Sequence, residues 1–531
     1  MSYVSLIFLV FFTVVACLYY LLPLGRHRFL IILAANMVFC YFAGGLSTLI
    51  LMVYLAAVTT VSARCIGKVY LDFDENKAGL SVKEQYRLLE QYKHKALRFL
   101  IIGLSLIAIA FFYVKIGRLL RLEPAGTIYN IIGYDDSGSI IWKVFIPIGL
   151  SFYTLSLLGY ILDVYWRKTV PVNNFLKVFT CISFFPTVIE GPIVRLSNLM
   201  DQISNPVSFR YDHVTMGLQL MMWGFFKKLI IAERFLLIQN EVFGNITQYR
   251  GFTVIVATFA NVIVDYADFS GCIDIARGSA QVLGIELPEN FRQPFFSKSA
   301  SEFWRRWHIT LGEWFKEYIY MPLARSPRFI KLVGKVRKQF NKRAGKIFST
   351  GVPLLLVWLL TGFWHGTGKD YLFWGLYWGN IILFSMICEP VFVNIKKLLK
   401  IRDSTFSYEC FQMARTFMLF AVGRMITATG SLRGFLRTLK QLAAEFNPWV
   451  FFDGSLFKLG LGEKDFRVGV YAVLIMWIAD LLSSRFCVRE KLKEEPLIVR
   501  WMIFGVGILM IVIFGMYGPA YNPSSFMYGN F

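Results

Sequence analysis

One histidine of this chain stands where an imidazole is costly to place without a purpose. His365 ends the apolar run LLLVWLLTGFWHGTG at residues 354–368. An ionisable side chain at membrane depth marks a functional site by default, although it can also be a structural histidine that donates to a carbonyl of a neighbouring helix. Gly362, Gly366 and Gly368 around it would let a substrate or another helix approach the backbone closely. An imidazole here can act as a general base toward a hydroxyl at neutral pH.

A second histidine, His308, lies in the aromatic and basic segment SEFWRRWHITLGEWFKEY at residues 301–318. The spacing predicts one helix that begins near an N-cap at Ser301. Its aromatic face would carry Trp304, Trp307, Leu311, Trp314, Phe315 and Tyr318. The adjoining strip would carry Arg305, His308, Gly312 and Lys316. From periodicity alone this is also the pattern of an interfacial helix among lipid headgroups.

Two further polar clusters fall inside or beside apolar runs. The segment 265–277 holds Asp265, Asp268, Ser270, Asp274 and Arg277. Asp274 and Arg277 stand three residues apart and can pair locally, and at least one of the other carboxylates should meet a cation or hydroxyl from another segment. The second cluster, FFPTVIEGPIVR at residues 184–195, offers Glu190 and Arg195.

Other kinds of site chemistry lack their motifs. The chain has no nucleotide-binding glycine loop, no nucleophile elbow and no zinc-protease pattern. Its eight cysteines are scattered without a CxxC pair, so we expect neither a metal site nor a disulfide framework. General base catalysis by the two histidines is the leading chemical prediction.

The amino-acid composition indicates which kind of fold holds the two histidines. The 531 residues are 56% hydrophobic and only 17% charged, and the longest uncharged runs exceed the roughly 20 residues that span a bilayer. This excludes a soluble enzyme and a single-pass anchored one. The formal net charge of +22 gathers between apolar runs, which the positive-inside rule explains better than nucleic-acid binding. The predicted fold is an all-α polytopic membrane protein.

Twelve apolar segments are candidate spans, and they predict about ten to twelve crossings. They lie near residues 2–22, 29–44, 46–63, 98–115, 141–162, 213–238, 251–267, 351–366, 370–391, 410–429, 467–484 and 500–517. The first is interpreted as a retained span, not a cleaved leader. The short piece 175–189 ends among Pro and Gly, which predicts a re-entrant or broken helix. We see one membrane domain over 1–531, with no internal repeat.

Charge sets the expected orientation of these spans. The segments 64–97 and 324–347 are predicted to be cytoplasmic loops, because they carry the largest Lys and Arg excess. The amino terminus is then outside. The acidic, turn-rich segment YDDSGS at 134–139 suits an outside loop.

At these motifs the chain resembles the membrane-bound O-acyltransferase (MBOAT) family, in particular the bacterial branch with the alginate O-acetyltransferase and teichoic-acid D-alanyltransferase membrane subunits. The similarity rests on FWRRWHITLGEWF and GFWHG, the segments that hold the two histidines. Supporting stretches occur in family order: IPIGLSFYT at 146–154, FFPTVIEGPIVR at 184–195, DFSGCIDIA at 268–276 and SFMYGNF at 525–531.

The resemblance implies a funnel through the membrane, with His365 as the catalytic histidine and His308 as the second histidine of the channel. It implies an acyl transfer, with acetyl the expected group, from a cytoplasmic thioester to an extracytoplasmic polysaccharide or other cell-envelope polymer. Acetyl-CoA or an acyl carrier protein thioester would be the donor, held by Arg305, Arg306 and Lys316. No bound cofactor is expected.

The same resemblance implies a bacterial cytoplasmic membrane and an exported partner protein that completes the transfer to the polymer. Asp268, Ser270, Asp274, Glu190 and Arg195 are the supporting polar residues expected near the site. Two alternatives stay open: D-alanyl transfer from a carrier protein to teichoic acid, and a transporter with an intramembrane histidine relay. Inverted repeats with broken spans, typical of many transporters, are not seen in the sequence.

Overall fold

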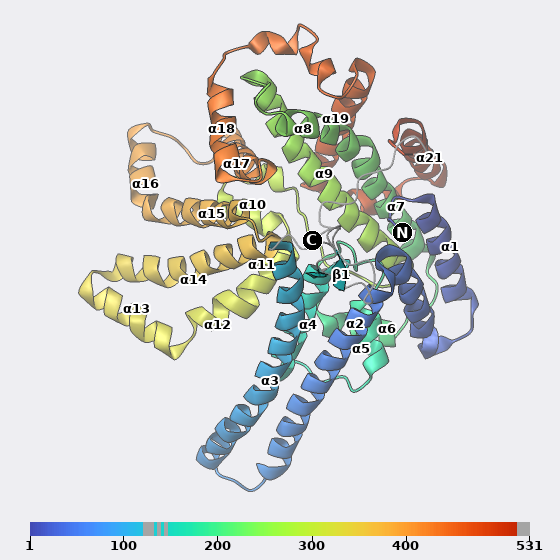
Figure 1. The fold of residues 1–531 in the computed structure, drawn as a ribbon, viewed down its shortest axis with the longest axis vertical. Helices are drawn as coiled ribbons and strands as arrows, with labels where there is room; N and C mark the ends of the chain where they lie inside the picture. The colour runs from blue at the N-terminus through green and yellow to red at the C-terminus, as the bar shows by residue number, and fades with distance from the viewer. Residues whose placement is uncertain (120–131, 135–139, 143–146, 518–531) are drawn as a thin grey trace. The chain divides into compact units, whose positions relative to one another are not determined.

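The structure is a computed structural model that describes residues 1–119, 132–134, 140–142 and 147–517 (Figure 1). The predicted outside loop at 134–139 and the SFMYGNF motif at 525–531 lie outside these residues, except for the backbone of Tyr134. Its contacts divide the chain into two compact units. The first contains Met1–Leu218 and Ala276–Pro288, and the second contains Gln219–Ile275 and Glu289–Met527. A single membrane domain over the whole chain stays a prediction.

The first unit is helical apart from one short antiparallel pair, β1 (Ile132–Tyr134) and β2 (Ile140–Trp142). This pair is the described exception to the predicted all-α fold. The helices are α1 (Leu6–Leu21), η1 (Gly25–Arg28), α2 (Phe29–Asn76), α3 (Val82–Leu119), α4 (Leu150–Tyr165), α5 (Phe175–Ile182), α6 (Leu196–Ser204) and the beginning of α7 (Tyr211–Phe225).

The glycine pair at the junction of two predicted spans breaks α2. Gly45 has φ 73° and ψ 177°, a conformation that only glycine adopts without strain, so α2 kinks at the junction of the two predicted spans, whose separate crossings stay a prediction. Beyond the second span, the segment 64–97 is mostly helical and not an irregular loop, while its cytoplasmic location stays a prediction. Both α2 and α3 continue as helix through most of it, and they are joined by a short turn at residues 77–81 (Figure 1).

The second unit is also helical. Its first elements are the end of α7, the π-helix η3 (Phe226–Ala232), α8 (Glu233–Gly244), most of α9 (Phe252–Val282), η4 (Pro294–Phe296), α10 (Ala300–Arg306), α11 (Ile309–Phe315), the π-helix η5 (Lys316–Tyr320), α12 (Met321–Ala324) and α13 (Pro327–Gln339). There follow α14 (Lys342–His365), α15 (Lys369–Ile387), α16 (Glu389–Leu398), α17 (Phe406–Ala428), α18 (Leu432–Ala443), η6 (Pro448–Phe451), η7 (Ser455–Lys458), α19 (Glu463–Ser483), α20 (Val488–Glu494) and α21 (Leu497–Phe514).

Eleven of the twelve predicted apolar segments lie mainly on helices, whereas the segment predicted at 141–162 begins in β2 and its described helical part is α4, from Leu150. Seven described helical stretches are long and apolar enough to cross a membrane, or eight if the bent pair α15 and α16 forms one span. This supports a polytopic membrane protein, whereas ten to twelve crossings stay a prediction. The short helix expected at 175–189 is confirmed as short, since α5 ends at Ile182. The basic segment 324–347 is mostly helical, because α13 and the start of α14 occupy it, and its cytoplasmic location stays a prediction.

Small residues let α14 and α15 approach closely within the second unit. A side chain at Gly362 would meet the backbone carbonyl of Tyr371, and one at Gly375 would meet the carbonyl of Trp358. In lipid, where apolar surface does not drive helices together, such close backbone contact is a main source of helix association. Of the two interpretations of Gly362 from sequence, the structure supports approach of another helix.

We therefore predict that Gly362→Ala destabilises the packing beneath His365. The new methyl group must displace the Tyr371 carbonyl, and overpacking of this kind costs about 1–3 kcal/mol. The melting temperature of the detergent-solubilised protein measures the effect. Gly334→Ala on α13 is the matched control, because a methyl group there meets no atom within 4 Å and favours the helix. Equal melting temperatures for both variants would contradict the role of Gly362.

Candidate functional site

The two histidines singled out from the sequence come together in the second unit. Their ring centroids are 6.4 Å apart, and the exposed fractions are 3% for His308 and 7% for His365. His365 is the last residue of α14, and His308 lies between α10 and α11. Segments separated in sequence thus place two buried imidazoles within reach of one small substrate group, while their roles stay predictions.

The helix predicted over residues 301–318 is wrong, because the chain breaks at His308. This residue has φ 48° and ψ 51°, in the left-handed region that L-residues rarely adopt. The first piece, α10, is capped by Ser299, whose hydroxyl accepts from the Glu302 backbone N–H, and not by Ser301. The break separates Arg305 from the predicted basic strip and turns His308 into the protein interior.

A neighbouring extended segment, residues 290–292, holds this break in place. The Ile309 N–H donates to the Asn290 carbonyl at 3.0 Å, and the Arg292 N–H donates to the Arg306 carbonyl at 2.9 Å. Phe291 and Trp307 form the bridge between them. The backbone groups that a continuous helix would have paired within itself are therefore satisfied by another part of the chain.

The His308 ring is held in an apolar pocket with one polar side. Its Nδ1 lies 3.2 Å from Asn290 Oδ1, and Phe269 of α9 packs edge-on at 4.8 Å between centroids. Burial, with a smaller contribution from the neighbouring His365, holds the pKa of His308 well below its usual range. The imidazole is consequently neutral at pH 7, the form that a proton acceptor needs.

Tryptophans surround the second imidazole. Trp364 and Trp374 lie edge-on to His365 at 4.8 and 5.1 Å between ring centroids. Trp304 packs in turn against Trp374 and Trp378. Within the described part of the chain, the buried indole N–H groups of Trp304, Trp374 and Trp378 have no hydrogen-bond partner. A buried N–H group without a hydrogen-bond partner costs free energy. A bound substrate with a polar acceptor could recover that free energy by accepting a hydrogen bond from one of these indoles.

The three residues expected to hold donor phosphates differ in their surroundings. Arg305 and Lys316 are exposed and have no ion-pair partner among the described residues. Arg306 is half-buried, and its guanidinium donates to Glu302 at 2.7 Å and to the Gln293 carbonyl at 3.5 Å. Arg305 and Lys316 can therefore bind an anion without breaking an existing pair, whereas Arg306 stabilises the local fold.

The acidic cluster of α9 meets cations from the π-helix η3. Lys227 pairs with Asp274 at 2.6 Å and donates to Ser270 at 2.8 Å. Lys228, only 1% exposed, pairs with Asp268. The expectation of a partner from another segment is confirmed.

The remaining ionic groups of this region also find their partners on other segments. The predicted local ion pair between Asp274 and Arg277 is wrong. Asp274 pairs with Lys227, and the Arg277 guanidinium donates to the Leu287 carbonyl. Lys228 also pairs with Glu233 at 2.7 Å, and Arg424 of α17 pairs with Asp265. These residues form a buried ionic cluster, defined as Lys227, Lys228, Glu233, Asp265, Asp268, Asp274 and Arg424.

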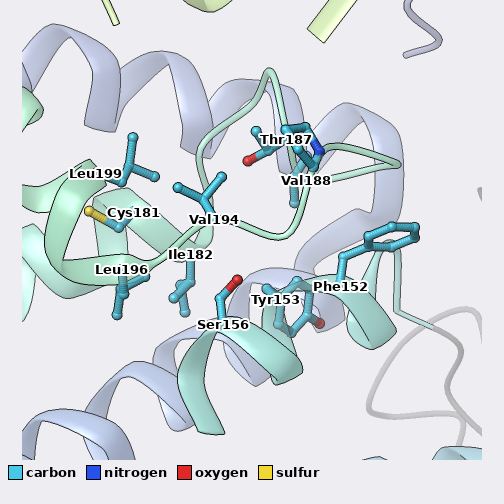
Figure 2. Close-up of a pocket in the computed structure, with 11 residues that line it drawn as sticks. Phe152, Tyr153, Ser156, Cys181, Ile182, Thr187, Val188, Val194, Leu196 and Leu199 are labelled. Atoms are coloured by element: carbon cyan, nitrogen blue, oxygen red, sulfur yellow. The ribbon is translucent and has the colours of Figure 1, made fainter. Parts of the chain in front are cut away.

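Glu190 and Arg195 belong to the first unit. Glu190 is fully buried, and Arg195 Nη1 lies 3.5 Å from Asp163 Oδ2. The same unit contains a hollow of about 350 Å³, open space included, between α4, α5 and the segment that leads to α6 (Figure 2). Its lining is mainly apolar, and neither Glu190 nor Arg195 contributes to it. The two histidines belong to the second unit, and the supporting role of Glu190 and Arg195 stays a prediction.

Three residues were not predicted from the sequence: Lys227 and Lys228 of the ionic cluster, and Asn290, which contacts His308. Lys227 and Lys228 stand in the apolar run MMWGFFKKLIIAE, and an ionisable pair inside a predicted span was a usable signal. Asn290 lies in a loop with no pattern around it, so no signal in a single sequence marked it. Among the described residues, no group of three or more His, Cys, Asp or Glu side chains could hold a metal ion.

A polytopic helical membrane protein with a buried histidine pair is the class that this fold and site define. Residues 170–420, which include both histidines, match the model of MBOAT, the membrane-bound O-acyltransferase family. The resemblance drawn from the motifs is thus confirmed over this part of the chain.

Curated relatives agree with this assignment. A "Probable alginate O-acetylase AlgI" of Pseudomonas syringae pv. tomato is 32% identical over 295 residues, 55% of this chain and 51% of that protein. A peptidoglycan O-acetyltransferase of Helicobacter pylori is 30% identical over 50% of this chain and 54% of its own length. A teichoic acid D-alanyltransferase of Bacillus subtilis is 28% identical over 43% and 56%. The matches span about half the length of these relatives.

The ionic cluster leads to a stability prediction. Lys228→Met removes the ammonium group that pairs with the buried carboxylates of Asp268 and Glu233, which should cost about 3–5 kcal/mol and lower the yield and melting temperature of the purified protein. The triple variant that also carries Asp268→Asn and Glu233→Gln should recover much of the loss. Lys335→Met, at an exposed position on α13, is the control. An unchanged melting temperature for Lys228→Met would show that the pairs contribute nothing.

Proposed function

We propose that this chain is a membrane-bound acyltransferase that moves an acyl group, most simply acetyl, from a cytoplasmic thioester to an extracytoplasmic polysaccharide or other cell-envelope polymer. The observation that carries the proposal is the buried pair His308 and His365 inside the segment that matches the family model. The names of the relatives, which include acetyl and D-alanyl transfer to polymers, support this reaction class.

The proposed reaction needs one base and no resident cofactor. His365 takes the proton of the attacking hydroxyl, whose oxygen forms a bond to the thioester carbonyl carbon. The carbon–sulfur bond then breaks, and the thiolate leaves with the proton from the imidazolium. An indole N–H beside His365, such as that of Trp374, can donate to the carbonyl oxygen as negative charge develops on it.

Basic residues support a phosphorylated donor. Arg305 and Lys316 are exposed and unpaired among the described residues, and α13 adds Arg328, Lys331, Lys335 and Lys338 on its exposed side. These charges suit the phosphates of acetyl-CoA or the phosphopantetheine of a carrier protein. The positive-inside rule explains the basic residues of α13 equally well, so Arg305 and Lys316 are the stronger evidence for donor binding.

The acceptor side of the proposal rests on the relatives. We place the chain in the bacterial cytoplasmic membrane, with an exported protein completing transfer to the polymer. D-alanyl transfer to teichoic acid is the alternative within the same chemistry, because one relative bears that name. A transporter with a histidine relay is the alternative from another class, and purified protein in vesicles separates the two. Thioester turnover favours the enzyme, while solute flux without turnover favours the transporter.

The central prediction is that His365→Ala abolishes acyl transfer and leaves a folded membrane protein. A positioned general base contributes about 10²–10⁴-fold, so the remaining rate should be near background. Donor-dependent transfer or thioester hydrolysis by the purified protein is the measurement, and monodisperse elution in detergent reports the fold.

The conservative variant His365→Gln separates basicity from hydrogen bonding. Glutamine resembles histidine in size and can hydrogen-bond, but it cannot take up a proton at neutral pH. We expect it to be as inactive as the alanine variant. Recovery of most of the activity in His365→Gln would show that the general-base role is wrong.

A second kinetic prediction concerns the donor. Arg305→Ala should raise the donor KM more than it lowers kcat, because it removes binding that the ground and transition states share. Arg306→Ala should mainly lower the melting temperature, since this side chain is already paired with Glu302. An unchanged donor KM in Arg305→Ala would contradict donor binding by Arg305 and favour the alternative, in which this segment lies among lipid headgroups.

A further inference from the structure

The Asn290 side chain, fully buried, controls the ring of His308. Its Oδ1 accepts from the Thr310 backbone N–H at 3.1 Å and from the Thr310 hydroxyl at 2.9 Å, and it lies 3.2 Å from His308 Nδ1. A backbone N–H can only donate, so the atom that faces it must be the amide oxygen and not the nitrogen. The orientation of the carboxamide is therefore determined by the fold, independently of the histidine.

This orientation determines which ring nitrogen carries the proton. A nitrogen that faces a carbonyl-type oxygen at hydrogen-bond distance must donate, which puts the hydrogen of His308 on Nδ1. A neutral imidazole has one N–H group, so Nε2 then holds the lone pair. Among the described contacts, α9 presents Phe269 to the ring, and α14 presents Trp364 and His365. His365 is the titratable group among them.

We propose that Asn290 is a positioning residue for the acyl transfer: it fixes His308 as the Nδ1–H tautomer, so that Nε2 accepts a hydrogen bond from the reacting hydroxyl and orients it toward His365. This role rests on the proposed function. Asn290 lies outside both histidine motifs, and the same segment maintains the left-handed turn at His308. One residue thus controls both the direction of the ring and its proton.

Burying the Asn290 amide costs free energy, which supports a specific role for this side chain. Its Nδ2 is buried and has no hydrogen-bond partner in the described part of the structure, which costs about 1–3 kcal/mol. Asn290→Leu removes both amide atoms at similar size. Asn290→Asp removes the unpaired donor but retains the acceptor for His308 Nδ1. The two variants therefore separate loss of the acceptor from disturbance of the fold.

The tautomer can be measured without reference to activity. Nitrogen-15 NMR of histidine-labelled full-length protein in lipid nanodiscs has five histidines to resolve, and His308→Gln assigns the signal. We expect a protonated Nδ1 in the wild-type protein and in Asn290→Asp, and loss of that single tautomer in Asn290→Leu. Asn380→Leu is the matched control, because Asn380 is exposed on α15 and its amide donates to the Leu376 carbonyl of the same helix.

Kinetics test the consequence for catalysis. Asn290→Leu should lower kcat about 10²-fold or more with little change in donor KM. Asn290→Asp should remain active, with the acid limb of its pH profile moved to higher pH, because a carboxylate beside the ring stabilises imidazolium. Asn380→Leu should match the wild type.

Two results would overturn the positioning role. One is a wild-type His308 protonated at Nε2, and the other is a folded Asn290→Leu protein with unchanged kcat and pH profile. The failure of the proposed function looks different. A His308 protonated at Nδ1 in a wild-type protein that turns over no thioester would overturn the acyl transfer, and with it the catalytic part of this inference.

Discussion

The left-handed turn at His308 is the constraint on which the candidate site depends. A non-glycine residue in this conformation costs about 1–2 kcal/mol, and it persists because residues 290–292 bind both sides of the break through their backbone. If α10 and α11 ran on as one helix, His308 would share an outer strip with Arg305. The break instead turns the imidazole toward His365 of α14. The strained turn thus brings the two imidazoles together.

A second constraint comes from burying charge where lipid surrounds the protein. Three carboxylates of α9 need cations, and the π-helix η3 supplies two of them from consecutive positions, Lys227 and Lys228. Such a π-helix turns less per residue than an α-helix, so neighbouring side chains can face the same partner helix. Because a buried charge without a partner is so costly, these pairs specify how η3 and α9 pack.

The helices α14 and α15 pack closely through small residues. Gly362 and Gly375 allow the two backbones to approach, which secures packing where lipid is as apolar as the side chains. The close approach also brings Trp374 against His365, so the same contact that joins the helices builds part of the site. Structural and chemical roles are therefore difficult to separate in this region.

The membrane class of the protein, its apolar segments and its two unusual histidines could be predicted from sequence alone, because hydrophobic runs and costly intramembrane ionisable residues are local properties. The sequence could not determine that the segment 301–318 breaks at His308, that Asp274 pairs with Lys227, or that Asn290 contacts the imidazole. Periodicity describes a segment as if it were alone, so it favoured a continuous helix and a local ion pair. Only the tertiary structure supplied the competing partners from distant segments, and their hydrogen bonds and ion pairs outweigh the local preferences.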